Sequence, residues 1–110
     1  MNRTNLGEFE ELVLLTVGVL YDNAYSVAIT NELDNQSGRK VNISAVHPVL
    51  YRLEEKGFLN SRLGESSAKR GGKRKRLFKI SSLGKIALDG SMNLRMKLRQ
   101  KIPAIAFGNL

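Results

Sequence analysis

Residues 44–57 read SAVHPVLYRLEEKG, and FLNSRLGE follows directly at residues 58–65. In the first stretch, apolar side chains recur at the i, i+3, i+4, i+7 spacing that places them on one face of a helix; they are Val46, Val49, Leu50 and Leu53. Ser44 is of a type that caps helix starts, and Gly57 is of the type that ends helices. The stretch therefore predicts an amphipathic helix from Ser44 to about Lys56, with Pro48 near its first turn.

The opposite face of this predicted helix remains available for a partner. Its members are Ala45, His47, Tyr51, Arg52 and Glu55. A helix about 10–12 Å wide fits a DNA major groove about 12 Å wide. A short helix that buries one face and exposes another of this composition is suited to reading base edges.

A basic β-hairpin is predicted after this helix. Residues 58–63 read as a strand, residues 64–72 as a polar loop, and residues 74–80 as the return strand. Six of the eight residues at 69–76, KRGGKRKR, are cationic, and the adjacent glycines supply the positive φ angles of a tight tip. Apolar and basic residues alternate imperfectly in the return strand, so the pattern does not settle which of its faces is buried.

Two helices are predicted before residue 44. The first runs from Leu6 to about Tyr21, with Asn5 as a cap, acidic residues in the first turns and a centre at residues 12–19 that is apolar nearly all round. The second runs from about Ser26, which can cap it, to residue 36, and Ser37-Gly38 closes it.

One long helix is predicted after the hairpin. It begins at Ser81 or Ser82 and ends before Pro103. An apolar stripe runs along it, and its members are Leu83, Ile86, Ala87, Gly90, Leu94, Leu98 and Ile102. Two glycines weaken such a helix, so we expect it to need a packing partner. The stripe fits a core or an interface far better than a cofactor site.

Charge is strongly polarised along the chain. The 110 residues carry a net charge of +8, yet residues 1–61 hold five Lys/Arg against eight Asp/Glu, and residues 62–110 hold thirteen against two. The first part is thus net −3 and the second net +11. A basic surface of this kind attracts anionic partners. A solvated basic tail is the alternative.

Composition excludes several classes of function. The chain has no cysteine and a single histidine, so it cannot form disulfides or a thiolate or multi-histidine metal site. No carboxylate pair, nucleophile elbow or P-loop spacing stands out, so we expect neither an enzyme nor a cofactor. The longest apolar run, residues 12–20, is too short to span a bilayer, and no signal peptide is visible. A cytoplasmic protein of one domain is the simplest interpretation.

The order of elements predicts a mainly α fold with a small β-hairpin, the winged helix-turn-helix. We expect three helices and a two-stranded wing over residues 1–80, a last helix over residues 81–103 packed on the same unit, and a tail at 104–110. Double-stranded DNA is the expected partner. The third helix would choose the sequence, while the wing would anchor phosphates.

The chain also resembles the PadR-like transcriptional regulators over roughly residues 6–90. The matching features are Leu6-Gly7, Tyr25 ahead of Ile29 and Leu33, the segment SAVHPVLYRLEEKG, the strand that follows it, the glycine-basic wing and KRLFKISSLGKIAL. His47 stands where the family commonly has a tyrosine that faces DNA. The resemblance implies a homodimeric repressor that reads a near-palindromic operator. It also implies dimerisation through the last and first helices, and a small aromatic or hydrophobic effector near the dimer interface.

Three sets of residues are candidates for functional sites. The reading helix contributes Ser44, Ala45, His47, Pro48, Tyr51 and Arg52. The wing contributes Lys69, Arg70, Lys73, Arg74, Lys75 and Arg76. The dimer interface contributes Leu83, Ala87, Leu94 and Leu98.

Several alternatives remain open. The basic stretch could be a solvated loop, and His47 a structural surface residue. Tyr51 could contact a phosphate or merely shield its helix. Arg52 could reach a phosphate or pair with Glu54 or Glu55. At the level of function, a winged-helix adaptor that docks an acidic protein and an RNA binder are the competing hypotheses, although the basic hairpin lacks the aromatic platform of single-stranded RNA readers.

Overall fold

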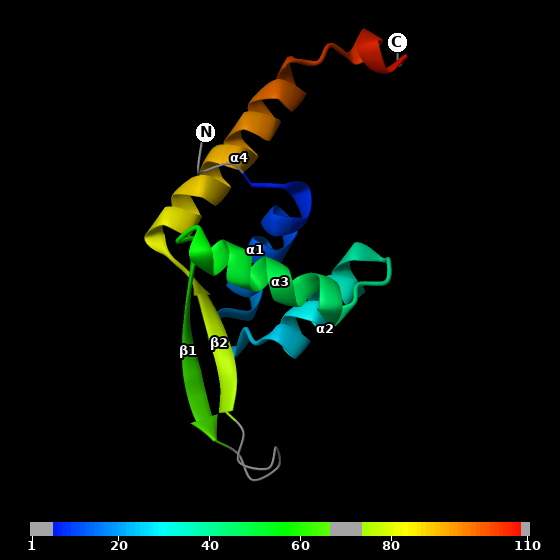
Figure 1. Ribbon diagram of the computed structural model, residues 1–110. Coiled ribbons are helices and arrows are strands. Elements are labelled where there is room, and N and C mark those ends of the chain that lie inside the picture. The colour runs from blue at the N-terminus through cyan, green and yellow to red at the C-terminus, as the bar shows by residue number, and fades with distance from the viewer. Residues whose placement is uncertain (1–5, 67–73, 109–110) are drawn as a thin grey trace.

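The computed structural model describes residues 6–66 and 74–108 of the chain (Figure 1). Its elements are α1 (Glu8–Leu20), the 3-10 turn η1 (Tyr21–Asn23), α2 (Ser26–Ser37), α3 (Ile43–Glu55), β1 (Leu59–Ser66), β2 (Arg74–Ile80), α4 (Ser82–Lys101) and the 3-10 turn η3 (Ala104–Phe107). Three helices, an antiparallel hairpin and a further helix follow one another as the sequence predicts. The mainly α winged helix-turn-helix fold is therefore confirmed.

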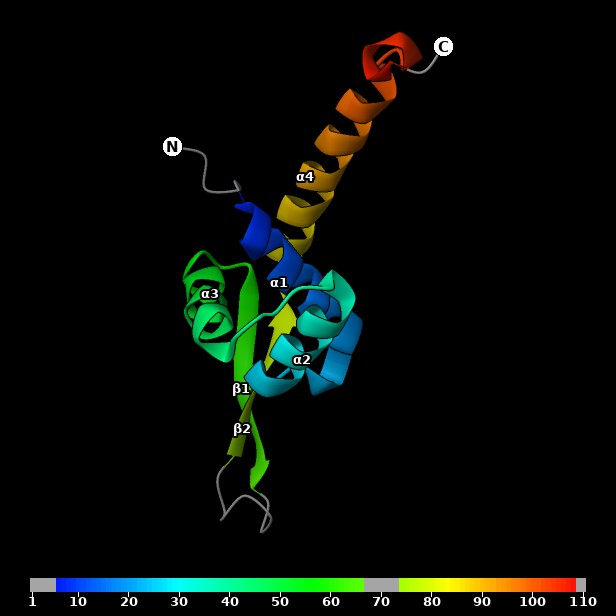
Figure 2. The same ribbon diagram turned by 90° about the vertical axis from the view of Figure 1, so that its right-hand side faces the viewer.

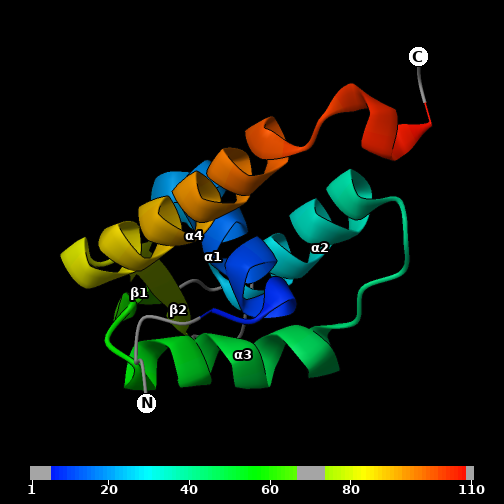
Figure 3. The ribbon, with the colours of Figure 1, turned by 90° about the horizontal axis from the view of Figure 1, so that it is seen from above.

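Helix α1 lies at the centre of the molecule. Viewed from above, it runs between α3 on one side and α4 on the other (Figure 3), and it also contacts α2. It begins at Glu8 with Gly7 as its cap, and the Gly7 N–H donates to Glu10 Oε1 at 2.8 Å. The predicted cap, Asn5, lies outside the described residues. Val19 is 70% exposed, so the apolar stretch at residues 12–19 is not covered all round by its own chain at this end of α1.

Two predicted serine caps are wrong. The cap residue of α3 is Asn42, two residues before the predicted Ser44, and the helix begins at Ile43, so Ser44 lies inside the helix. Ser26 is likewise the first helical residue of α2, after Tyr25. With α3 starting at Ile43, Pro48 is its sixth residue and lies beyond the first turn, where its missing N–H leaves the Ser44 carbonyl without a helical donor.

The core lies between the three N-terminal helices and the base of the hairpin. The predicted buried face of α3 is confirmed, since Val46, Val49, Leu50 and Leu53 are all at most 4% exposed. They pack in one cluster with residues of α1, α2 and the hairpin, among them Leu14, Ile29, Phe58 and Phe78. Among the described residues, no helix has both the length and the apolarity needed to cross a membrane.

The hairpin is longer than the sequence suggests. Strand β1 continues to Ser66 instead of ending at Leu63, and it pairs antiparallel with β2 from Leu59↔Ile80 outward, with an irregularity between Leu63 and Ser66. Phe78 is buried, so the β2 face that carries it is the inner face. The Phe78 N–H also donates to the Ala24 carbonyl at 2.8 Å, which attaches β2 to the segment between η1 and α2.

Helix α4 packs on the body through its first half, and Arg95 at the start of its second half adds an ion pair with Glu11 of α1, with Nε and Oε1 3.5 Å apart. Ser81 caps it by accepting a hydrogen bond from the Gly84 N–H at 3.0 Å, and the helix ends at Lys101, shortly before Pro103. Gly84 and Ala87 are buried, whereas every residue after Ser91 in α4 is exposed. Figure 2 shows this second half projecting away from the body, in the direction opposite to the hairpin.

Gly84 makes the close approach of α4 to the body possible. A Cβ atom at this position would lie 2.2 Å from the Phe58 carbonyl oxygen, which is backbone and cannot rotate away. We expect Gly84→Ala to lower the free energy of unfolding by about 1–3 kcal/mol, as overpacking does. Gly90→Ala is the matched control, because a Cβ there meets nothing within 4 Å and alanine stabilises a helix interior by up to about 1 kcal/mol relative to glycine. Urea denaturation of the two variants measures both effects, and equal stabilities would contradict the close contact.

Candidate nucleic-acid interface

The exposed face of α3 holds all six residues that the sequence assigns to the reading helix. Ser44, Ala45, His47, Pro48, Tyr51 and Arg52 are each exposed, and they lie opposite the four buried residues of the helix. The connection to α2 fixes the start of α3, because the Val41 N–H donates to Asp34 Oδ1 at 2.7 Å. The 3.6-residue period thus places this surface where a partner can reach it.

The Tyr51 ring is held between the helix and the wing. Its centroid lies 5.1 Å from the His47 ring at an interplanar angle of 71°, and 6.2 Å from the Phe78 ring of β2 at 82°. Edge-to-face geometry of this kind is the favoured arrangement of aromatic pairs. Tyr51 remains 45% exposed. The two aromatic side chains of the reading face therefore have orientations set by contact with each other and with the base of the wing.

A buried carboxylate connects α1 to α3. Glu10 is 7% exposed, and its Oε2 accepts hydrogen bonds from Arg52 Nε at 3.0 Å and from Lys56 Nζ at 2.8 Å. Its Oε1 accepts from Lys56 Nζ at 2.9 Å and from the Gly7 N–H at 2.8 Å. The sequence places Glu10 in a helix start, which is correct, but 42 residues separate it from Arg52 and no local pattern reveals that pairing.

Arg52 consequently has a different partner from the two that the sequence suggests. Neither Glu54 nor Glu55 binds it among the described residues; its Nε bonds to Glu10 instead. The side chain stays 51% exposed. Because a guanidinium carries five N–H donors, the bond to Glu10 leaves donors for a second acceptor such as a phosphate.

The environment of Glu10 lowers its pKa. Burial by itself would raise the pKa of this carboxyl, but the hydrogen bonds from Lys56, Gly7 and Arg52, together with the positive charge of Lys56, outweigh burial and hold the pKa below its ordinary value of 4.5. Glu10 is thus ionised at neutral pH, and the ionised form stabilises the contact between α1 and α3.

Two wing cations lie on the α3 side of the hairpin. Arg74 and Arg76 share the inner face of β2 with Phe78 and are both exposed. Arg74 Nε donates to the Gly64 carbonyl at 2.7 Å, and Arg76 Nη1 donates to Ser61 Oγ at 2.9 Å. The Ser61 hydroxyl in turn donates to Glu54 Oε2. A chain of hydrogen bonds thus runs from the wing strand through β1 to α3.

The remaining predicted wing cations are not equivalent to these two. Lys75 lies on the other face of β2, where its Nζ is 3.8 Å from the centroid of the Tyr25 ring, a cation–π contact with the body. Lys69, Arg70 and Lys73, together with the Gly71-Gly72 tip, lie outside the described residues. The structure therefore brings Arg74 and Arg76 to the α3 side and turns Lys75 away from it.

The residues predicted for the dimer interface divide into two groups. Leu83, Leu94 and Leu98 are exposed at 44–57%, but Ala87 is 3% exposed and packs in the core of its own chain. Ala87 offers no surface to a partner. Sequence reasoning missed other large apolar side chains that are exposed near the end of the chain, and these are Met92, Met96, Ile105 and Phe107.

The exposed face of α3 and the basic hairpin beside it place the protein in the winged helix-turn-helix class, whose members bind DNA. Residues 6–66 and 74–108 contain no group of three or more histidine or acidic residues that could hold a metal ion. The model of the transcriptional regulator PadR-like family matches residues 14–90. The chain belongs to the PadR-like family of transcriptional regulators, as its sequence motifs suggest.

Solved structures show the same fold. A PadR-like transcription factor from Bacteroides fragilis superposes with a TM-score of 0.69 at 20% identity, covering 84% of this chain and 84% of that one. A PadR family regulator from Eggerthella lenta DSM 2243 has a TM-score of 0.66 at 22% identity over 81% of this chain and 75% of its own. The Aeropyrum pernix ORC1 protein in complex with DNA gives 0.66 at 19% identity, over 91% of this chain and 27% of that chain. No curated protein matches the chain.

The Glu10 cluster makes stability depend on pH. We expect Glu10→Gln to lower the free energy of unfolding at pH 7 by about 1–3 kcal/mol, the range for hydrogen bonds to a charged group. Because the folded-state pKa is lowered, the contribution of Glu10 is present above the ordinary value of 4.5 and disappears as pH falls through the folded-state value. Urea unfolding at pH 7 and at lower pH should therefore show the two proteins converging in acid.

Glu55→Gln is the control for this prediction. Glu55 is an exposed carboxylate on α3 with no ion pair in the described part of the chain. Its loss should change stability little at either pH. If Glu10→Gln behaved like Glu55→Gln, the carboxylate would not hold α1 against α3.

Proposed function

We propose that this chain is a cytoplasmic, homodimeric repressor that reads a near-palindromic operator with α3 and holds the DNA backbone with its wing. The observation that carries the proposal is the face of α3 that presents His47 and Tyr51 beside the arginines of β2. Residues 1–80 would form the DNA-binding unit, residues 81–103 the dimerisation helix and residues 104–110 a tail.

The dimensions and composition of α3 support its role as the reading helix. The helix has 13 residues, and its buried face is entirely aliphatic. His47 can donate to or accept from base edges, whereas Ala45 and Pro48 are small enough to let the helix approach them. The bracing of Tyr51 against His47 and Phe78 keeps this surface in one arrangement before DNA binds. Pre-organisation of this kind reduces the entropy lost on binding.

The wing arginines support a role in phosphate binding. Each uses one N–H group to bond within the hairpin, Arg74 to Gly64 and Arg76 to Ser61, and each remains exposed. A guanidinium that is positioned by one hydrogen bond can still present a fork to a phosphate. The Aeropyrum pernix protein, whose structure is a complex with DNA, shares this fold over part of its chain, which agrees with DNA as the partner.

The second half of α4 supports a homodimer. It exposes Leu94 and Leu98 at 57% each, and the end of the helix projects away from the body (Figure 2). The radius of gyration is 16.7 Å, whereas a compact domain of this length has about 13 Å. Leucine side chains that a helix exposes outside its own core are covered by another surface when the protein associates. A second copy satisfies this need, and the symmetry of such a dimer would place two α3 helices about one DNA turn apart.

We also propose that the bound dimer represses transcription and that an effector controls its binding to DNA. A dimer that covers two successive major grooves would exclude other proteins from the same DNA segment, which is the simplest route to repression. The family resemblance implies that a small aromatic or hydrophobic effector near the dimer interface could release it.

Loss of the two wing arginines should weaken DNA binding in a salt-dependent way. Replacing both residues, as Arg74→Gln/Arg76→Gln, removes two positive charges from the α3 side of the hairpin. If each contacts one phosphate, the slope of log K against log salt becomes shallower by about 0.9 per arginine. Fluorescence anisotropy with duplex DNA at several salt concentrations measures the slope.

A second variant with the same net charge as Arg74→Gln/Arg76→Gln shows whether the change in salt slope comes from the wing or from the overall charge of the protein. Lys97→Gln/Lys101→Gln removes two exposed cations from the far end of α4. Its salt slope should stay close to that of the wild type. Equal slopes for the wing variant and the α4 variant would remove the wing from the interface.

Introducing charge on α4 should dissociate the dimer. Leu94→Glu/Leu98→Glu places two carboxylates on adjacent turns of the exposed half of the helix. We expect a monomer by sedimentation velocity and a weaker affinity for a two-half-site duplex, with the helical circular dichroism of the folded chain retained. Val27→Glu is the control, because this valine is 48% exposed on α2, outside the two helices that the family resemblance assigns to dimerisation. A Leu94→Glu/Leu98→Glu protein that stays dimeric would place the interface elsewhere.

A further inference from the structure

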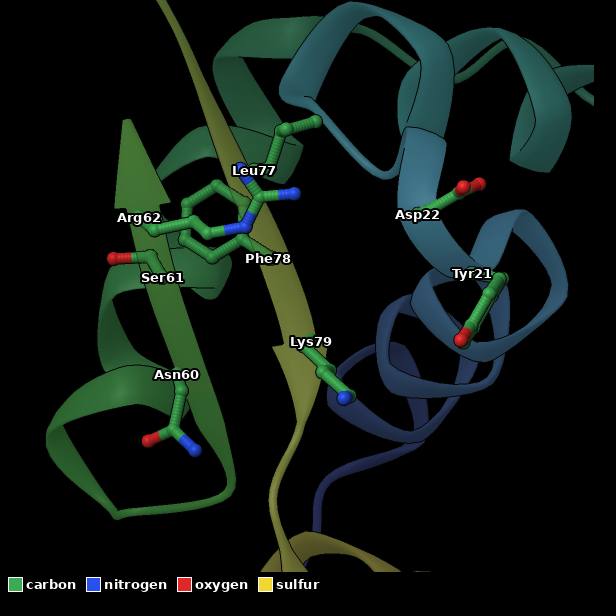
Figure 4. A pocket seen from close by; sticks show the side chains of 8 residues that line it. All are labelled: Tyr21, Asp22, Asn60, Ser61, Arg62, Leu77, Phe78 and Lys79. Carbon is green, nitrogen blue, oxygen red and sulfur yellow. The ribbon is translucent and has the colours of Figure 1, made fainter. Parts of the chain in front are cut away.

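A cavity lies between η1 and the outer face of the hairpin, away from α3. Its volume is about 270 Å³, and Tyr21 and Asp22 on one side and Arg62, Leu77 and Lys79 on the other contribute to its walls (Figure 4). These hairpin residues belong to the face opposite the inner face that carries Arg76 and Phe78. The cavity is thus separate from the proposed DNA-reading surface.

Two cations of this cavity have no partner in the described part of the chain. Arg62 and Lys79 make no hydrogen bond or ion pair there, whereas Arg74 and Arg76 on the inner side of β2 both do. The register pairs Arg62 with Leu77, so Lys79 is the diagonal neighbour of Arg62 on the same face. Diagonal neighbours lie about 7–8 Å apart, and both long side chains can therefore reach one anionic group. Figure 4 shows the Arg62 guanidinium crossing over β2 beside Leu77, with Lys79 extending towards Tyr21.

The same cavity also offers apolar contacts. Leu77 is half-buried and Phe78 is buried beneath it, while the ring of Tyr21 stands at the rim. Tyr21 is the sole non-glycine residue with a positive φ in the described ranges, at 51°, and it is 69% exposed. Tyr21 is the C-cap residue of α1, where the chain leaves the helix, and such a backbone costs a non-glycine residue about 1–3 kcal/mol. Here it holds a large aromatic ring beside the cavity and in contact with solvent.

The position of Lys79 argues against DNA as the occupant. It lies one residue pair from the base of the hairpin, where Leu59 pairs with Ile80. Arg74, at the other end of β2, is five residues away, which is about 17 Å along a strand. Lys79 also points to the face opposite Arg76. A phosphate backbone that follows α3 and the end of the wing would not pass over this site.

We propose that this cavity binds a small organic monoanion, with its carboxylate held by Arg62 and Lys79 and its apolar body against Leu77 and Tyr21. The volume lies just below the range of about 300–1,000 Å³ for sites of drug-sized ligands, so the occupant is a single ring or a short branched chain. Asp22 at the rim disfavours a second negative charge on the ligand. This binding site is independent of the proposed dimeric repressor, because it needs neither a second copy of the chain nor DNA.

Benzoate tests the site, with neutral benzamide as its isosteric comparison. We expect benzoate to shift the amide signals of Leu77, Phe78 and Lys79 in ¹H–¹⁵N correlation spectra of the wild-type chain, with a dissociation constant of about 1 mM for so small a ligand. Benzamide should bind about tenfold more weakly or not at all. Arg62→Gln/Lys79→Gln should abolish the preference for benzoate while the melting temperature stays unchanged, because both side chains lie on the surface.

The matched control is again Lys97→Gln/Lys101→Gln, which has the same net charge and should bind benzoate like the wild type. Three outcomes would overturn the proposal. The first is no shift of the amide signals with benzoate at about 10 mM, ten times the expected dissociation constant. The others are equal binding of benzoate and benzamide, or an equal loss of benzoate binding in the two double variants. If Arg62→Gln/Lys79→Gln retained benzoate binding but lost affinity for duplex DNA, the two cations would belong to the DNA interface. Failure of the proposed repressor would instead appear in the DNA and dimer measurements and would leave the benzoate result intact.

Discussion

The buried Glu10 carboxylate is the interaction on which the position of the reading helix depends. Helix α1 lies at the centre of the molecule, and Glu10 near its start accepts hydrogen bonds from Arg52 and Lys56 of α3. The aliphatic face of α3 would pack against α1 over a range of small rotations, since apolar contacts are not directional. Hydrogen bonds to a buried charge are directional, and they therefore fix the rotation of α3 about its own axis within this range.

The wing is attached to the same helix by two further contacts. Tyr51 packs edge-on against Phe78, and Glu54 reaches Arg76 through the Ser61 hydroxyl. Both contacts with α3 lie at the same level of the hairpin, because Ser61 of β1 pairs with Phe78 of β2, and the hydrogen bond from Arg76 to Ser61 continues towards the end of the wing. Together they set the angle between α3 and β2, so the surface that we propose to read bases and the surface that we propose to hold phosphates move as one unit.

Local patterns in the sequence predicted much of this fold, because its helices follow the 3.6-residue period and its hairpin is marked by glycines and charge. The buried residues of α3 and the start of β2 at Arg74 follow directly from spacing. The helix caps at Ser26 and Ser44 were wrong because a capping residue type does not specify which nearby position takes the extended backbone. The partner of Arg52 and the burial of Ala87 depend on contacts between distant segments, which no local pattern encodes. The roles of the reading-helix and wing residues stay predictions.

In vitro selection of duplexes bound by the wild type and by His47→Ala tests the central claim most directly. The account predicts that the wild type enriches a two-fold symmetric motif with half-sites about 10–10.5 base pairs apart. In the variant, the symmetry and spacing should persist, and the preferred base should change at one position in each half-site. An asymmetric motif in the wild type, or an identical motif in His47→Ala, would contradict the assignment of sequence reading to the exposed face of α3.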